Sequence, residues 1–281
     1  MKTGIETVCA LNGGEARKAF AHLKELGYDC CDLQTFVNTE TEWFSAPDRE
    51  TRWRQVGEAA RRAGIEISQI HGPWRFPPQD ETEEDRAERF EKMSISLEGA
   101  QAVGAPCMAI HNIMPFGCAG DPEPERFMDM NREYFGRLLQ KARSCGVALA
   151  LENMPFLNLR LSTPRQVLDF VKEFDDPFLK VCLDTGHAAV FGLSAGDSVR
   201  LIGKDMLACL HVHDNDGQHD RHWTPYRGVV DWEDFSRALC EIGFEGSVSL
   251  ETNVPARVPE EIRPAWEKAL AATARHIAGK Q

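Results

Sequence analysis

The sequence of 281 residues predicts an α/β protein of the (β/α)8, or TIM-barrel, class, with a single domain over residues 1–281. Eight short apolar runs recur along the chain, and several are hydrophobic without interruption, as in strands buried on both faces of a parallel sheet. Amphipathic segments separate these runs, and the length suits one closed barrel. A doubly wound open sheet is the alternative, but no glycine-rich phosphate loop follows the first run.

The expected strands are the eight apolar runs. In chain order they are IETVCA, DCCDLQTF, IEISQIH, APCMAIH, VALALEN, FLKVCLDTG, MLACLHVHD and GSVSLET. Each intervening helix returns the chain to the start of the next parallel strand. The carboxyl ends of all eight strands should therefore meet at one rim of the barrel.

Helix signals occupy the intervals between the strands. Thr82 is a candidate N-cap before an acidic first turn, and Pro122 and Pro124 suit the first turn of the next helix. Amphipathic patterns predict further helices over residues 15–27, 48–63, 163–174, 231–242 and 260–277, with a weaker pattern over 195–203.

The composition argues against several classes of protein. The formal net charge is −12, and no block of Lys and Arg offsets it, which argues against nucleic acid as a partner. No apolar stretch suits a signal peptide or a membrane span, so we expect a cytoplasmic protein without a membrane partner. Nine cysteines without a CxxC pair fit reduced thiols. Barrels of this kind often associate, so a homo-oligomer stays an open alternative.

Ionisable side chains end six consecutive expected strands. They are His71, His111, Glu152, Asp184, His211 and Glu251. Carboxylates gathered at one rim repel one another unless a cation neutralises them. The sequence therefore predicts one bound divalent metal ion: Mn²⁺, Zn²⁺, Co²⁺, Fe²⁺ or Mg²⁺. Mixed carboxylate and imidazole ligands argue against Ca²⁺.

With one cation, the expected metal ligands are Glu152, Asp184, His211 and Glu251. The remaining candidates are expected to bind substrate oxygens or to hold a second or third metal: His71, His111, His187, Asp220 and His222. His213 is expected in the loop after the seventh strand and is not counted among the ligands.

Aromatic residues follow several of the strand ends. They are expected to form an apolar wall for the carbon face of a sugar, with loop packing as the alternative: Trp74, Phe116, Phe156 and Trp223. If the substrate carried a phosphate, the candidates to bind it would be Arg160, Arg221 and Arg227.

The motifs HGPW, LENM, CLDTGHAAVFG, HVHDNDGQHDRH and SLET resemble, in this order, the xylose-isomerase-like TIM-barrel superfamily. That superfamily includes ketose 3-epimerases, inosose dehydratases, many sugar-phosphate isomerase/epimerase-like proteins and endonuclease IV. The ketose 3-epimerase branch implies that Glu152, Asp184, His211 and Glu251 bind one metal and that His187 binds a substrate oxygen. It also implies a sugar or polyol isomerase or epimerase. Glu152 and Glu251 would transfer the proton beside a carbonyl, through a metal-stabilised enediolate.

The same resemblance leaves alternatives. One is an inosose-type dehydratase or lyase. Another is an endonuclease IV-like phosphodiester hydrolase at abasic DNA sites, whose nine ligands for three zinc ions all have counterparts here. The acidic charge and the lack of basic rim loops favour a small carbohydrate or polyol over DNA. A sugar-binding protein without turnover is the non-catalytic alternative.

One position departs from the ketose 3-epimerase pattern. Those enzymes carry a further glutamate six residues after the glutamate of the fifth strand, where this chain has Asn158. The departure favours a relative that acts on another polyol over a 3-epimerase of free ketoses.

Overall fold

A computed structural model describes residues 1–7, 13–38, 40, 42–78 and 80–280. Within them, eight parallel strands pair in the order β7-β6-β5-β4-β3-β2-β1-β8. Their bounds are β1 (Lys2–Thr7), β2 (Cys30–Leu33), β3 (Glu66–His71), β4 (Cys107–Ile110), β5 (Ala148–Glu152), β6 (Leu179–Asp184), β7 (Leu207–His211) and β8 (Ser247–Leu250). A parallel bridge from Val212 to Leu250 joins the two ends of this order. The predicted (β/α)8 barrel is confirmed.

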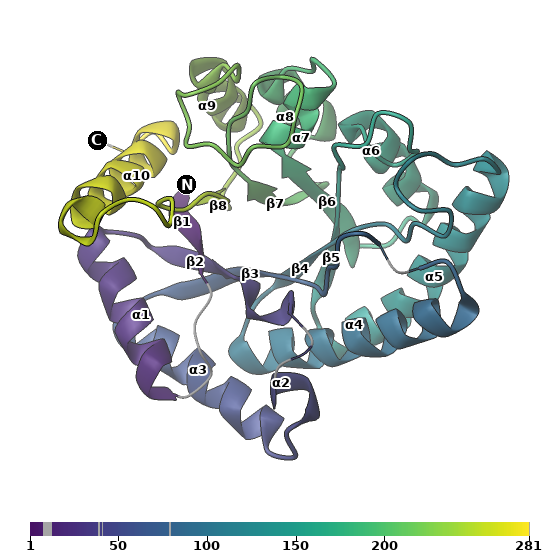
Figure 1. Ribbon diagram of the computed structural model, residues 1–281, viewed down its shortest axis with the longest axis horizontal. Coiled ribbons are helices and arrows are strands. Elements are labelled where there is room, and N and C mark those ends of the chain that lie inside the picture. The colour runs from purple at the N-terminus through teal and green to yellow at the C-terminus, as the bar shows by residue number, and fades with distance from the viewer. Residues whose placement is uncertain (8–12, 39, 41, 79, 281) are drawn as a thin grey trace.

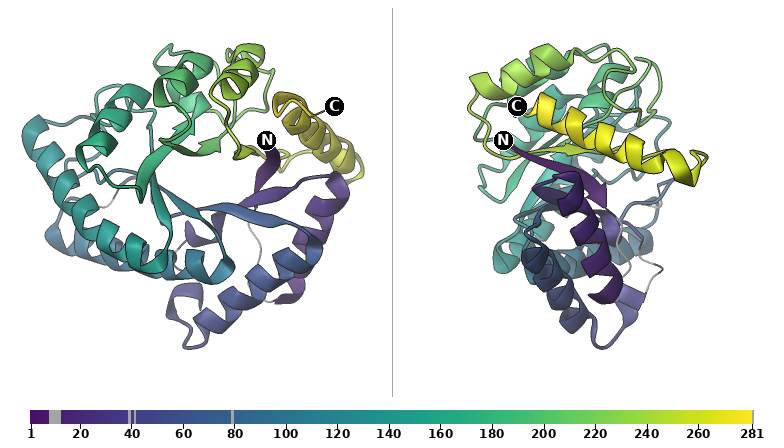
Figure 2. Two further views of the ribbon diagram at one scale, coloured as in Figure 1. Left: turned by 180° about the vertical axis from the view of Figure 1, so that it is seen from behind. Right: turned by 90° about the vertical axis from the view of Figure 1, so that its left-hand side faces the viewer.

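Helices surround the strands on every side (Figures 1 and 2). The α-helices are α1 (Gly13–Leu26), α2 (Glu42–Ser45), α3 (Arg49–Ala63), α4 (Glu83–Val103), α5 (Pro124–Cys145), α6 (Pro164–Glu173), α7 (Thr185–Val190), α8 (Ala195–Ile202), α9 (Trp232–Glu241) and α10 (Arg263–Ile277). Two 3₁₀ turns accompany them, η1 (Gln34–Phe36) and η2 (Glu260–Ile262). No helix in the described part of the chain combines the length and apolar character needed to cross a membrane.

Local capping explains where several helices begin. The Thr82 hydroxyl accepts a hydrogen bond from the Asp85 amide, and the Asp85 carboxylate accepts one from the Thr82 amide. Pro124 occupies the first turn of α5, where no backbone donor is needed. The weaker pattern over residues 195–203 does form a helix, α8, which Ser194 caps.

Several expected strand bounds differ from the structure, and the differences at the first two strands affect the site. The first strand begins at Lys2 rather than at residue 5, while residues 8–10 of the expected run lie outside the described part of the chain. The second strand ends at Leu33, because residues 34–36 turn into η1. The ring of Phe36 in this turn packs on Trp53 of α3, with 5.8 Å between centroids.

Small side chains form a separate cluster inside the barrel. They are Cys107, Ala109, Ala150, Cys182 and Cys209, from strands β4 to β7. A larger apolar layer lies between the strands and the helices. The ionisable side chains of the interior gather toward the carboxyl ends of the strands, where the loops after each strand begin.

Candidate metal centre

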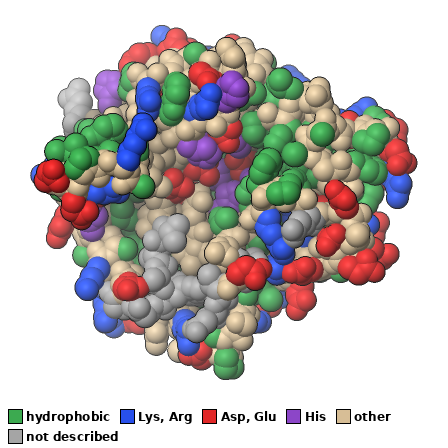
Figure 3. All heavy atoms as spheres, in the orientation of Figure 1, with side chains coloured by type: hydrophobic (Ala, Val, Ile, Leu, Met, Phe, Trp, Pro, Cys, Tyr) green, Lys and Arg blue, Asp and Glu red, His purple; other side chains and the backbone are tan. Residues whose placement is uncertain are grey.

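The residues that end the strands meet at one end of the barrel. A cavity of about 260 Å³ opens there, and His71, His111, Glu152 and Glu251 are among the residues that line it. Figure 3 shows histidine and acidic side chains at the bottom of a hollow in the middle of this face. The structure therefore brings together residues that lie as much as 180 positions apart, from His71 to Glu251.

Four side chains form one tight group within this region. One ligand atom from each of Glu152, Asp184, His211 and Glu251 lies within 4.8 Å of all the others, and all four residues are buried. The Nδ1 atom of His211 is 3.0 Å from Oε1 of Glu152 and 3.4 Å from Oε2 of Glu251. The group comes from β5, β6, β7 and the residue just after β8.

The chemistry of this group fits a divalent cation. Three carboxylates are buried around one imidazole, and Oε2 of Glu251 has no hydrogen-bond partner among the described residues. Burial and the charges of Glu152 and Asp184 raise the pKa of Glu251, although His211 opposes them. A cation bound between these oxygens would remove the repulsion and satisfy the orphaned atom.

Two further histidines adjoin Glu152 on its other side. The Nε2 atom of His111 is 3.1 Å from Oε2 of Glu152, and Nε2 of His71 is 3.5 Å from the same oxygen. Burial would raise the pKa of Glu152, but the imidazoles of His211 and His111 hold it well below its ordinary value. The indole of Trp74 meets the ring of His111 edge-on, 4.2 Å between centroids. Glu152 is thus the carboxylate shared by both sides of the cavity.

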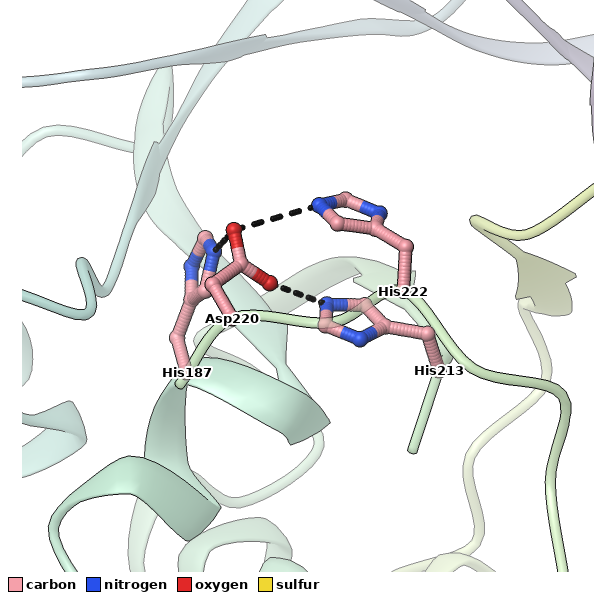
Figure 4. A group of neighbouring side chains, drawn as sticks. All are labelled: His187, His213, Asp220 and His222. Atoms are coloured by element: carbon pink, nitrogen blue, oxygen red, sulfur yellow. Dashed lines mark hydrogen bonds and ion pairs between the residues drawn. The ribbon is translucent and has the colours of Figure 1, made fainter. Parts of the chain in front are cut away.

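A second group surrounds Asp220, which Figure 4 shows between the rings of His187, His213 and His222. Oδ2 of Asp220 is 3.3 Å from Nε2 of His187 and 3.2 Å from Nε2 of His222. Against the effect of burial, Asp184 and Asp220 raise the pKa of His187 to about 10. The hydrogen bond with Asp220 likewise raises the pKa of His222 to about 10.

Backbone carbonyls fix the tautomers of two of these histidines. Nδ1 of His187 is 2.7 Å from the carbonyl oxygen of Asn153, and Nδ1 of His222 is 3.0 Å from that of Glu251. Because a carbonyl can only accept, both Nδ1 atoms donate, and both Nε2 atoms turn toward Asp220. The Asp220 carboxylate can be neutralised in two ways: both rings can be protonated at Nε2, or one cation can bind between the carboxylate and the two Nε2 atoms.

Sequence reasoning missed four residues that the structure places in or beside these groups. They are Glu6, Asp32, Gln34 and His213. Glu6 and Gln34 line the cavity, and Nε2 of Gln34 donates to Oε1 of Glu251 at 3.1 Å. His213 is fully buried, and its Nε2 is 2.9 Å from Oδ2 of Asp184. Asp32 lies one residue before the end of β2 at Leu33. A search for ionisable residues at strand ends would have found it if the expected strand had ended there.

The structure places two of the four aromatic residues of the expected apolar wall at the cavity. Trp74 and Phe156 line the cavity, whereas Phe116 and Trp223 are not among its lining residues. Phe116 packs under Arg126, and Trp223 packs under Arg227.

The candidate phosphate-binding arginines are engaged elsewhere. Arg160 lies near Asp121, Arg221 bonds to Asp216, and Arg227 stacks on Trp223. Among the described residues that line the cavity, none is a lysine or an arginine. The described walls therefore offer no lysine or arginine to a phosphate.

The chain matches a family model and several curated proteins. The family model described as xylose isomerase-like TIM barrel matches residues 20–277. D-psicose 3-epimerase from Ruminiclostridium cellulolyticum is 29% identical over 168 residues, which cover 59% of this chain and 53% of that enzyme. The chain thus spans about half the length of this curated relative.

Solved structures share the fold at lower identity. A D-psicose 3-epimerase determined in the presence of D-fructose superimposes with a TM-score of 0.78, at 18% identity, covering 99% of this chain and 100% of that one. The IOLI protein with a bound zinc atom superimposes with a TM-score of 0.73, at 17% identity, covering 99% and 96%.

Proposed function

Because the chain belongs to the xylose isomerase-like TIM barrel family, we propose that it is a metal-dependent isomerase or epimerase of a small, unphosphorylated sugar or polyol. The observation that carries the proposal is the buried cluster of Glu152, Asp184, His211 and Glu251 at the bottom of a sugar-sized cavity. The relation to a D-psicose 3-epimerase supports the reaction class. The lack of a lysine or arginine among the described lining residues supports a substrate without phosphate.

The four clustered residues would hold one ion, which is Mn²⁺, Zn²⁺, Co²⁺, Fe²⁺ or Mg²⁺ by the chemistry of its ligands. When bound, such an ion acts as a Lewis acid toward substrate oxygens and offsets the negative charge that develops as a proton leaves carbon. The zinc of the IOLI protein is a precedent for a metal in a barrel of this fold.

Glu152 and Glu251 are the proposed proton-transfer pair. They come from the end of β5 and from the residue after β8, so their carboxyl groups enter the cavity from different strands. One would remove the proton from the carbon beside the carbonyl, and the other would return a proton to the opposite face. A dehydratase would begin with the same proton removal and then lose a β-hydroxyl.

Other lining residues would orient the substrate. His71, His111, His187, Asp220 and His222 offer hydrogen bonds to hydroxyl groups. Trp74 and Phe156 offer apolar surfaces to the carbon face of the ring.

A second candidate function has one observation in its favour. The group around Asp220 directs the Nε2 atoms of His187 and His222 toward one carboxylate, as ligands of a second ion would be directed. Several metals at one site suit phosphodiester hydrolysis, as the endonuclease IV resemblance implies. Nicking of a duplex with an abasic site would favour this candidate, and metal analysis would separate one ion from three.

The test of the main proposal is proton exchange at carbon. Free ketohexoses, including D-psicose, D-fructose and D-tagatose, would be incubated with the metal-loaded protein in D₂O and followed by NMR. We expect deuterium to enter the carbon beside the carbonyl of at least one sugar or related polyol. We expect Glu152→Gln and Glu251→Gln to abolish the exchange. The matched control is Glu173→Gln, at an exposed position on α6 where the carboxylate pairs with Arg132. Full activity in either site variant would refute the two-carboxylate scheme.

A further inference from the structure

A buried ion pair lies outside the candidate metal centre, behind the loops that follow β3 and β4. Asp80 belongs to the first loop, and Arg89 lies on α4. The side chain of Asp80 is 1% exposed and that of Arg89 is 10% exposed. Nη1 of Arg89 donates to Oδ2 of Asp80. A buried pair of this kind is costly to desolvate, so its place in the fold calls for a reason.

The pair holds the backbone of the loop after β4 from two sides. Nη2 of Arg89 donates to the carbonyl oxygen of His111 at 2.9 Å and to that of Asn112 at 3.4 Å. Oδ2 of Asp80 accepts a hydrogen bond from the amide of Met114 at 2.9 Å. The Arg89 guanidinium and the Asp80 carboxylate thus fix two carbonyls and one amide within residues 111–114.

The ring of His111 depends on this backbone support. Its Nδ1 atom is buried and has no hydrogen-bond partner among the described residues. Its Nε2 atom faces Glu152 at 3.1 Å and His71 at 3.2 Å. No group in the described part of the chain therefore accepts a hydrogen bond from Nδ1 of His111, as a carbonyl does for His187. The direction of Nε2 is set by where the main chain places the residue and by Trp74 against the ring.

We propose that the Arg89–Asp80 pair is a positioning element of the site, which aims the imidazole of His111 at Glu152 through the His111 carbonyl. Its effect on turnover rests on the proposed function, whereas its effect on the His111 ring does not. The planar fork of arginine is required, because one group must reach the Asp80 carboxylate and the His111 carbonyl together. Lysine keeps the charge but presents a single nitrogen.

The decisive variant is Arg89→Lys, because removal of the whole side chain would leave Asp80 as an uncompensated buried charge. The matched control is Arg200→Lys. Arg200 also uses its fork, with Nε on Glu241 and both Nη atoms on Asp234, but it lies on α8, on the outside of the barrel. A third variant, Arg89→Ala, would be assayed with and without added guanidinium ion.

Two measurements read the outcome. In the first, ¹⁵N-histidine NMR records the imidazole signals, with His111→Asn used to assign His111. We expect Arg89→Lys to move the His111 signal and Arg200→Lys to leave it unchanged. In the second, sugar turnover should fall in kcat by about 10- to 100-fold in Arg89→Lys, as misplacement of a site residue does. Metal content should stay unchanged, and guanidinium should restore part of the activity of Arg89→Ala.

The results separate this proposal from the function proposed above. An unmoved His111 signal in a folded Arg89→Lys variant would overturn the positioning role, whatever the turnover. If the wild-type protein turns over no sugar and the His111 signal still moves, the positioning role stands and the epimerase proposal fails. Equal losses of activity in Arg89→Lys and Arg200→Lys would assign the pair to stability alone.

Discussion

Oδ2 of Asp32 lies 3.3 Å from Nε2 of His211, on the opposite side of the ring from Glu152. The same carboxylate oxygen accepts a hydrogen bond from Nε2 of Gln69 at 3.1 Å. Asp32 is 1% exposed and sits behind the imidazole, so it favours a proton on Nε2. Nδ1 is then free of its proton and turned toward Glu152 and Glu251, where a metal would bind.

Asp32→Asn should therefore weaken metal binding by about 10- to 100-fold, the usual effect of losing a carboxylate behind a ligating histidine. Calorimetric titration of metal-stripped protein with Mn²⁺ or Zn²⁺ would measure this. Asp29→Asn is the control, because the Asp29 carboxylate bonds to Thr3 and Lys280 at the edge of the barrel. Equal affinities for wild type and Asp32→Asn would show that Asp32 does not set the ligating nitrogen.

Gly186 lets His213 approach Asp184. A methyl group at Gly186 would lie 2.0 Å from Cε1 of His213, whose Nε2 bonds to Asp184. We expect Gly186→Ala to lower the free energy of unfolding by about 1–3 kcal/mol, the cost of overpacking a buried site, and to reduce metal affinity. Urea unfolding and metal titration check the two effects.

Gly136→Ala is the matched control for this change. It lies in the middle of α5, where a new methyl group would be 4.0 Å from Phe174. Helix propensity predicts a gain of about 0.5–1 kcal/mol there, with unchanged metal binding. A Gly186→Ala variant as stable as wild type would contradict the close approach of His213.

The ion pair between Arg200 of α8 and Asp234 of α9 predicts that the free energy of unfolding depends on pH. The hydrogen bonds from Arg200 lower the pKa of Asp234 to about 2, from an ordinary value of 3.8. A carboxyl whose pKa is lower in the folded state stabilises the fold above its unfolded pKa and loses that contribution as pH falls. Asp234→Asn should thus cost about 1 kcal/mol at pH 7, and the difference from wild type should shrink as pH falls from about 4 toward 2.

Urea titrations at pH 7 and at pH 3 measure this difference. Asp197→Asn is the control, because Asp197 pairs with the same arginine but is 78% exposed, and it should cost little at either pH. A cost for Asp234→Asn that grows as the pH falls would have the wrong sign for this pair.

Local signals predicted much of the fold, because they act within a few residues. Thr82 and Pro124 mark helix starts by their own hydrogen-bonding chemistry, and the structure has helices at both places. The ends of strands β3 to β7 were predicted closely enough to identify His71, His111, Glu152, Asp184 and His211.

Residues at the ends of β1 and β2 were missed for a physical reason. The apolar run IETVCA placed Glu6 near the start of a strand, but β1 begins at Lys2, so Glu6 lies near its carboxyl end and pairs in register with Asp32. The run DCCDLQTF placed Asp32 in mid-strand, whereas η1 begins at Gln34. The apolar run extends to Phe36 because the Phe36 ring packs on Trp53 from the turn η1. The sequence pattern alone does not distinguish a buried turn of this kind from a longer strand.

The central claim is that one divalent ion is held between Glu152, Asp184, His211 and Glu251. The most direct measurement is an anomalous difference map from crystals of the protein loaded with Mn²⁺. The account predicts a strong peak bounded by the three carboxylates and by Nδ1 of His211. A peak found only beside Asp220, or no peak between these four residues in fully loaded protein, would contradict it.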